Sequence, residues 1–195
     1  MSALGTLLAE VRACDRCADA LPHGPRPILQ MHGSARILIA AQAPGRKVHA
    51  SGIPFDDASG DRLRHWLGLT PQQFYDAKRV AIVPMGFCFP GTAASGDKPP
   101  RPECAPAWRG ALLAHLKKLR LTLVIGRYAQ AWHLPDAAAS LTETVRAWRT
   151  HAADTIALPH PSPRNNGWFK HNPWFERELV PALRSRVAAA LAEPD

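Results

Sequence analysis

The chain has 195 residues, of which 46% are hydrophobic and 21% are charged, a composition typical of a globular protein. No apolar run approaches the roughly 18 residues that a membrane helix needs, and the segment Met1–Glu10 lacks the basic start of a secretory signal. We therefore expect a cytoplasmic, monomeric protein without a membrane partner, folded as a single domain over residues 1–195. The net charge of +8 favours a polyanionic partner such as nucleic acid, because each neutralised phosphate releases counterions.

Four short apolar runs alternate with helical patterns along the chain. Their length and lack of polar residues indicate strands that are buried on both faces. Strands that alternate with helices favour a parallel sheet with helices on both sides. We predict a three-layer α/β/α sandwich with a central four-stranded parallel sheet, whose strands cover Arg36–Ala41, Val80–Val83, Leu121–Ile125 and Thr155–Leu158.

The segments between these strands contain helical patterns and two long loops. Ser59 is the expected N-cap of the helix after the first strand. The loops are expected over Arg46–Asp57 and Phe89–Pro102, where glycine and proline are frequent. Apolar residues at helical spacing predict helices around Leu4–Val11, Leu63–Leu67, Trp108–Leu119, Tyr128–His133, Val145–Trp148 and Glu176–Leu191.

Two loops at strand ends carry the residue types expected of a binding site. The fourth strand runs into a stretch with three prolines in five residues, which places His160 on a stiff loop. The first strand runs into the Gln42–Gly45 turn, whose backbone N–H groups could meet a carbonyl or a phosphate. Ligands of open α/β sheets bind at the carboxyl ends of the strands, so both loops are candidates for the site.

The four cysteines of the chain predict one metal site. Cys14 and Cys17 form a C-x-x-C pair, and Cys88 and Cys104 enclose the predicted loop rich in proline and glycine. Reduced thiols are the rule in the cytoplasm, so disulfides are not expected. Four converging thiolates could hold either zinc or an iron–sulfur cluster, and their spacing does not choose between the two.

Taken in order, these motifs resemble the uracil-DNA glycosylase superfamily. The segment Ala41–Gly45, followed by Gly52–Phe55 and Ser59–Gly60, is similar to the first motif of the iron–sulfur branch, often called family four. The stretch His160–Asn165, followed by Gly167 and Trp168, looks instead like the second motif of the single-strand-selective monofunctional enzymes. The resemblance implies a monofunctional DNA repair hydrolase that removes uracil from DNA and leaves an abasic site. It also implies a [4Fe–4S] cluster on the four cysteines, with zinc as the alternative.

The resemblance also assigns roles to individual residues. His160, neutral or cationic, would donate to the uracil oxygen that gains charge, and Phe55 would stack on the flipped base. Gln42 and the backbone of Ala43, Pro44 and Gly45 would hydrogen-bond the base edge. Further base contacts are expected from Met85 and Gly86, at the end of the second strand. DNA contacts are expected from Arg46, Pro163, Arg164, Asn165 and Lys170.

The chain departs from the family pattern where the water is activated. Ala43 stands at the position of the usual Asp, and Gln42 and Val48 replace the two Glu of the iron–sulfur branch. Pro84 takes the place of the Asn that reads the base edge. His49 is a candidate to activate the water, as are Asp56 and Asp57. An alternative function is a module that binds uracil or abasic sites tightly or covalently, with little turnover.

Overall fold

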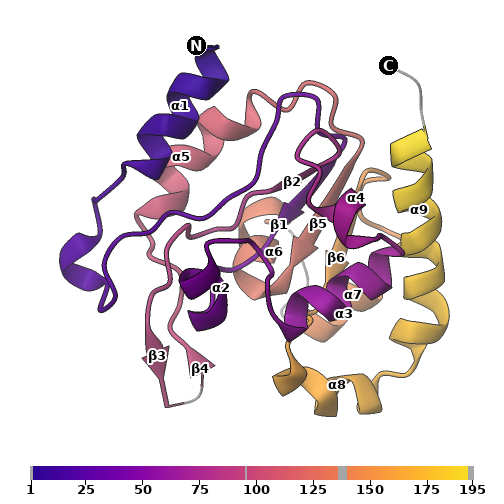
Figure 1. Cartoon of the computed structure of the whole chain (residues 1–195). Coiled ribbons are helices and arrows are strands. Elements are labelled where there is room, and N and C mark those ends of the chain that lie inside the picture. Colours follow the sequence, from indigo (N-terminus) through magenta and orange to yellow (C-terminus); the bar gives the residue numbers. More distant parts are fainter. Residues whose placement is uncertain (1, 95, 136–139, 193–195) are drawn as a thin grey trace.

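The computed structural model describes residues 2–94, 96–135 and 140–192. Its centre is a four-stranded sheet in which every neighbouring pair of strands is parallel (Figure 1). In sheet order these strands are β2 (Val80–Ile82), β1 (Ile37–Ala40), β5 (Leu121–Ile125) and β6 (Thr155–Leu158). The predicted three-layer α/β/α sandwich with a four-stranded parallel sheet is therefore confirmed, and two of the four predicted strands have the expected bounds.

Helices follow or precede each strand. A π-helical segment, η3 (Phe175–Leu179), leads into the last helix, and two short 3₁₀ helices are η1 (Ala18–Ala20) and η2 (Pro163–Asn165). The α-helices are α1 (Ala3–Arg12), α2 (Arg46–Ser51), α3 (Ala58–Leu67), α4 (Pro71–Phe74), α5 (Cys104–Leu113), α6 (Gly126–His133), α7 (Leu141–Arg146), α8 (Asn166–His171) and α9 (Val180–Ala192). In the part of the chain that the structure describes, no helix is both long and apolar enough to span a membrane.

The sheet is buried on both faces because successive side chains of a strand point to opposite sides. Ile37 and Ile39 of β1 belong to the core cluster that α3, η3 and α9 complete. Leu38, between them, belongs to the other cluster, which α1 and α5 complete. Figure 1 shows α1 and α5 together on one side of the sheet and α3 and α9 on the other. Apolar burial on both faces thus holds the three layers together.

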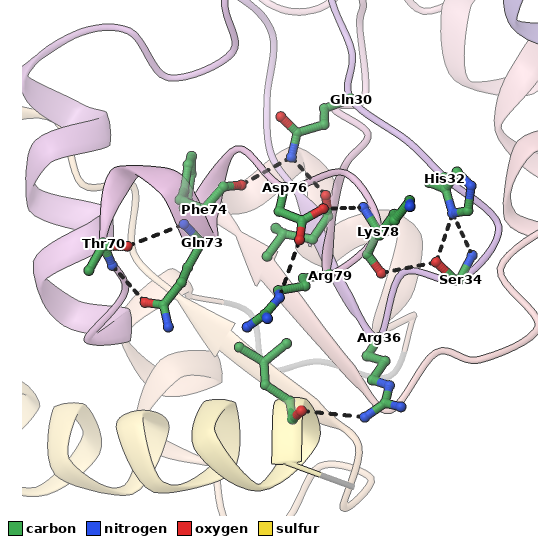
Figure 2. A network of polar contacts seen from close by, with 12 residues as sticks. Gln30, His32, Ser34, Arg36, Thr70, Gln73, Phe74, Asp76, Lys78 and Arg79 are labelled. Atoms are coloured by element: carbon green, nitrogen blue, oxygen red, sulfur yellow. Dashed lines mark hydrogen bonds and ion pairs between the residues drawn. The ribbon is translucent and has the colours of Figure 1, made fainter. Parts of the chain in front are cut away.

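The amino ends of β1 and β2 are fastened by polar contacts (Figure 2). The Gln30 side-chain amide donates to the carbonyls of Phe74 and Val80, at 3.0 and 2.8 Å. The Ser34 hydroxyl donates to the Lys78 carbonyl at 3.2 Å. These bonds satisfy backbone groups at the closed end of the sheet, which leaves the opposite, carboxyl end for a ligand.

Both predicted long loops contain regular structure. Helix α2 begins at Arg46, inside the first of them. The second, apart from residue 95, contains a small antiparallel hairpin of β3 (Thr92–Ala93) and β4 (Gly96–Asp97). Short polar segments such as these bury few apolar residues, so they leave no hydrophobic period in the sequence.

Two predicted helix boundaries were also wrong. Helix α5 begins at Cys104 and ends at Leu113, so Leu116 and Leu119 pack beyond it. The N-cap of α3 is Asp57, whose Oδ1 accepts the Gly60 N–H at 3.0 Å, and Ser59 lies inside the helix. Asp and Ser are about equally good N-caps, which is why the sequence alone did not separate them.

The cap of α3 gives a stability prediction. We expect Asp57→Ala to lower the free energy of unfolding by about 1 kcal/mol, because the Gly60 N–H loses its acceptor. Asp57→Asn should retain nearly all of the stability, since an amide oxygen can accept the same bond. Urea unfolding followed by circular dichroism measures both, with Ser59→Ala as the comparison. A larger loss for Ser59→Ala than for Asp57→Ala would contradict this assignment of the cap.

Candidate active site

A cleft of about 590 Å³ opens at the carboxyl ends of the central strands. Its walls come mainly from four segments that are far apart in the sequence: the turn after β1 with the start of α2, the loop into α3, the β3–β4 hairpin, and the loop after β6. Ile28 and the end of β2 complete the lining. The lining residues are Ile28, Ala41–Val48, Pro54, Phe55, Asp57–Ser59, Ile82, Pro84, Gly96–Lys98, His160 and Ser162–Asn165. The two loops that the sequence selected therefore share one cleft.

His160 lies half-buried in this cleft, and backbone contacts hold it. Ahead of it, the Gln130 side chain donates to the Leu158 carbonyl at 3.1 Å. Behind it, Asn165 Nδ2 donates to the His160 carbonyl at 2.7 Å. These bonds hold the backbone on both sides of the imidazole, in agreement with the stiff loop that the prolines predicted.

One hydrogen bond determines which ring nitrogen of His160 can donate. The Ser162 N–H donates to His160 Nδ1 at 3.2 Å, so Nδ1 is an acceptor and the proton of the neutral ring is on Nε2. Burial lowers the pKa of His160, against a smaller opposing effect of the Asp57 and Asp97 carboxylates. The site therefore favours a neutral imidazole with Nε2–H free to donate.

Phe55, which also lines the cleft, has an unusual backbone. Its φ of 56° makes it the only non-glycine residue of the described chain in the left-handed region, a conformation that costs free energy and occurs often at functional sites. Its carbonyl accepts from the Tyr75 hydroxyl at 3.3 Å and from Arg64 Nη1 at 3.4 Å. A Cβ at Gly60 would lie only 1.7 Å from that carbonyl oxygen, so Gly60 permits the approach. The backbone of Phe55 is thus fixed, and its ring packs edge-on against the ring of Phe74, with centroids 6.1 Å apart.

The turn after β1 is tied to the end of β2. The carbonyls of Ala41 and Gln42 accept the N–H groups of Met85 and Gly86, at 2.7 and 2.9 Å. This pairing uses the backbone donors that could have met a base, and neither Met85 nor Gly86 lines the cleft. The predicted substrate contacts at these two positions do not fit the geometry; Pro84 lines the cleft instead.

His49 does not line the cleft either. Its ring packs near His23 and Phe89, with centroids 5.8 and 5.9 Å away. Burial lowers the pKa of His49, with smaller contributions from Arg26 and His23. The structure therefore gives His49 no place from which to activate a water in the cleft. Of the other two candidates, Asp57 lines the cleft and Asp56 does not.

The predicted DNA contacts fall into two groups. Arg46 and the run Pro163–Asn165 line the cleft, whereas Lys170 lies on α8 outside it. Sequence reasoning missed Lys47, Asp97 and Lys98, which also line the cleft. It also missed Arg62, whose guanidinium donates to the Ser162 carbonyl at 3.2 Å and so braces the His160 loop. Lys47 adjoins the first motif in sequence, whereas Asp97 and Lys98 are brought beside the motifs only by the fold.

A buried arginine holds the end of β2, where Pro84 lines the cleft. Arg109 of α5 is fully buried, and its Nη1 donates to the carbonyls of Val83 and Pro84 at 2.7 and 3.2 Å. Its Nη2 lies 2.6 Å from His133 Nε2, which must be the acceptor because a guanidinium has none to offer. Burial lowers the pKa of Arg109 to about 10, so the group stays charged at neutral pH. A buried cation thereby holds the strand end that carries Pro84.

The four cysteines line a second, much smaller cavity, between the C-x-x-C segment and the start of α5. Two N–H groups point at sulfur: Trp108 Nε1–H donates to Cys14 and the Phe87 N–H donates to Cys104, both at 3.4 Å. Burial raises the pKa of Cys104 to about 12 and also raises that of Cys88. Among the described residues, no group of three or more His, Cys, Asp or Glu side chains is arranged to hold a metal ion. The four thiols line one cavity, but they are not arranged around a common metal position, so the metal site stays a prediction.

Comparison with known proteins places the chain in a family. The model of the Uracil DNA glycosylase superfamily matches residues 30–184, a range that contains every residue lining the cleft except Ile28. The chain belongs to this superfamily, and its membership supports the role of a glycosylase hydrolase that acts on DNA in base excision repair. Among solved structures, the chain is similar to the solution NMR structure of "a putative Uracil DNA glycosylase" from Methanosarcina acetivorans. The two share 19% identity over 80% of this chain and 93% of that one, with a TM-score of 0.47.

The pair of Arg109 and His133 makes stability depend on pH. Burial and, to a smaller extent, the Arg109 cation lower the pKa of His133 to about 4, below about 6.5 in the unfolded chain. Between these values the unfolded state binds the proton and the folded state does not, so stability falls as the pH drops from about 6.5 to about 4. We expect His133→Gln, which keeps an acceptor for Arg109, to flatten this dependence in urea titrations at several pH values. A variant as acid-sensitive as the parent would contradict the assignment.

Proposed function

We propose that the protein removes uracil from DNA by hydrolysing the N-glycosidic bond, leaving an abasic site and an uncut strand. One observation carries the proposal: a neutral imidazole with a free Nε2–H shares a cleft with a fixed phenylalanine ring and the Gln42–Gly45 turn. Family membership supports the bond that is broken. The identity of the base rests on the chemistry of these side chains.

His160 suits the charge that develops as the bond breaks. The electron pair of the glycosidic bond leaves with the base, so negative charge grows on a pyrimidine carbonyl oxygen. A donor already aimed at that oxygen lowers the barrier without reorganising at the moment of reaction. A neutral donor also avoids burying an unpaired cation in the free enzyme. The tautomer fixed by Ser162 is therefore the one that the reaction needs.

Phe55 and Gln42 would select and hold the extruded base. A flipped base is read by stacking on aromatic rings and by hydrogen bonds to its Watson–Crick edge. The Gln42 side chain offers both an acceptor and a donor, which matches the N–H and carbonyl groups on the edge of uracil. Pro84 has no side-chain donor, so in this proposal Gln42 takes over the edge reading.

The rim of the cleft would bind the DNA backbone. Arg46, Lys47, Lys98 and Arg164 line the cleft, and cations of this kind position a strand through its phosphates. Extrusion of the base leaves a gap in the base stack of the DNA. Pro163 and Asn165 lie on the loop beside His160, and in this proposal they fill that gap. Uracil-containing DNA is thus the partner that the charge and shape of the cleft favour.

We also propose that Cys14, Cys17, Cys88 and Cys104 hold a [4Fe–4S] cluster, with zinc as the other metal that such a set accepts. Their placement around one cavity and the two N–H···S bonds support four thiolate ligands. When bound, the group would supply a cross-link between the N-terminal segment and α5. The proposed hydrolysis transfers no electrons, so the cleft residues would not depend on redox chemistry of the group.

The excision proposal is tested with oligonucleotides that carry one uracil, treated with alkali to reveal abasic sites. We expect turnover with excess substrate, and a single-turnover rate at least about 100-fold lower for His160→Ala, because one donor to the leaving base is lost. Phe55→Ala should weaken binding of uracil-containing DNA. The control is His32→Ala, an exposed histidine at the opposite end of the sheet.

The outcomes separate an enzyme from a binding module. Product that stays bound in a one-to-one ratio, with no further turnover, would favour the module that retains abasic sites. Excision of hypoxanthine or xanthine but not uracil would refute the assigned base. A His160→Ala rate close to that of the parent would remove the imidazole from the chemistry.

The metal proposal is tested on protein purified without oxygen. An iron–sulfur cluster gives a brown protein with absorbance near roughly 400 nm, and each Cys→Ser substitution should reduce both colour and iron content. Cys88→Ser and Cys104→Ser are the clearest tests of metal binding, because burial limits the other groups that these two sulfurs can contact. Colourless protein with one zinc per chain would replace the cluster by zinc, and metal-free protein of full activity would refute the site.

A further inference from the structure

The β3–β4 hairpin is fitted between the two catalytic loops of the cleft. On one side, a Cβ at Gly96 would lie 2.5 Å from Arg164 Nη1, so the guanidinium of the His160 loop packs directly on the hairpin backbone. On the other side, Arg46 Nη2 donates to Thr92 Oγ1 at 3.3 Å. Figure 1 shows the hairpin reaching out from the sheet beside α2. The hairpin therefore places β4 beside both the first-strand turn and the histidine loop.

Asp97, at the end of β4, brings a carboxylate to the turn that lacks one. A Cβ at Gly45 would lie 3.2 Å from Asp97 Oδ2, which means that this oxygen rests against the backbone of the turn. Asp57 and Asp97 are the acidic residues that line the cleft in the described parts of the chain. Asp57 already uses Oδ1 to cap α3, whereas Asp97 makes no cap or ion pair within the described parts of the chain.

The same carboxylate is close enough to affect His160. Burial is the main influence that lowers the pKa of the imidazole, and Asp57 and then Asp97 oppose it. Asp97 therefore lines the same cleft as the donor for the base, and its carboxylate lies against the turn that faces the base. A carboxylate in such a cleft is the kind of group that accepts a proton from an attacking water.

We propose that Asp97 is a catalytic residue: it replaces, from the hairpin, the carboxylate that Ala43 does not supply, and it accepts the proton of the attacking water. This inference rests on the proposed excision of uracil.

The step balances without a further reactant. The bond between sugar C1′ and the base nitrogen breaks, and its electron pair leaves with the base, whose oxygen His160 stabilises. The water oxygen forms a bond to C1′ while one of its protons passes to the Asp97 carboxylate. The departing base then takes a proton, and Asp97 returns its own proton to the solvent. The products are uracil and an abasic site, and the enzyme is unchanged.

The geometry also explains the glycine in the turn. Gly45 has φ −84° and ψ 177°, a conformation that any residue adopts, so its backbone does not require glycine. The requirement is steric, since a side chain here would push on Asp97 Oδ2. Glycine at 45 and aspartate at 97 thus form one arrangement, contributed by two segments about fifty residues apart.

The test compares single-turnover excision of uracil by the parental protein and by Asp97→Asn, which keeps the shape and loses the proton acceptor. We expect a rate at least about 100-fold lower, the range typical of a lost general base, with the Kd for uracil-containing DNA changed less than about threefold. Asp97→Ala should recover part of its rate as sodium formate is added, because formate can take the place of the missing carboxylate. The matched control is Asp154→Asn, at the amino end of β6 and away from the cleft.

Each outcome decides between the two proposals. A parental protein that excises no uracil would refute the proposed function itself. A parental protein that excises uracil, with Asp97→Asn within about threefold of its rate, would leave that function standing and overturn the role of Asp97. A large loss in Asp97→Ala that formate does not restore, together with a weakened Kd, would show that Asp97 only shapes the cleft, and would also overturn the inference. Circular dichroism of each variant excludes misfolding as the cause.

Discussion

The hydrogen bond from the Ser162 N–H to His160 Nδ1 is the constraint on which the chemistry of the cleft depends. It is a weak bond by itself, but it decides that the other nitrogen carries the proton of the neutral ring. Asn165 and Arg62 hold the backbone that supplies the bond. A reaction that needs a donor for a leaving anion is thereby served without a buried positive charge in the resting protein.

The scaffold makes that local arrangement possible by closing one end of the sheet and leaving the other open. Polar side chains take up the backbone groups at the amino ends of the strands, whereas the carboxyl ends carry turns rich in proline and glycine. Arg109 connects the core with the cleft, because its buried guanidinium donates to the carbonyls at the end of β2. The same residue therefore contributes to the packing of the layers and to the geometry of the site.

The sequence was sufficient for the features with a strong local signature. Continuous apolar runs identified the four strands, and β5 and β6 have the predicted bounds; β5 is buried along its full length and β6 at every residue except Thr155. The position of His160 followed from the prolines, since they fix the backbone whatever its neighbours are. The single metal site and the single domain remain predictions, because no observation on this chain tests them.

What the sequence could not give is the part of the site that depends on contacts across long distances in the chain. Asp97 lies in a polar hairpin that leaves no periodic pattern, and nothing near it in sequence indicates that it touches Gly45. The same limit explains His49, which belongs to the right segment but turns toward His23 and Phe89 on the helix that forms there. Met85 and Gly86 were expected at the base from their place at the end of the second strand, but their N–H groups donate to the first turn instead.

The short segment from Val83 to Cys88 is shared by both cavities of the molecule. Arg109 grips its first residues, Gln42 pairs with Gly86, and Phe87 is bound to the Cys104 sulfur. Because the same six residues contact Arg109, Gln42 and the Cys104 sulfur, we expect a substitution inside this segment to alter the cleft and the cysteine cavity together.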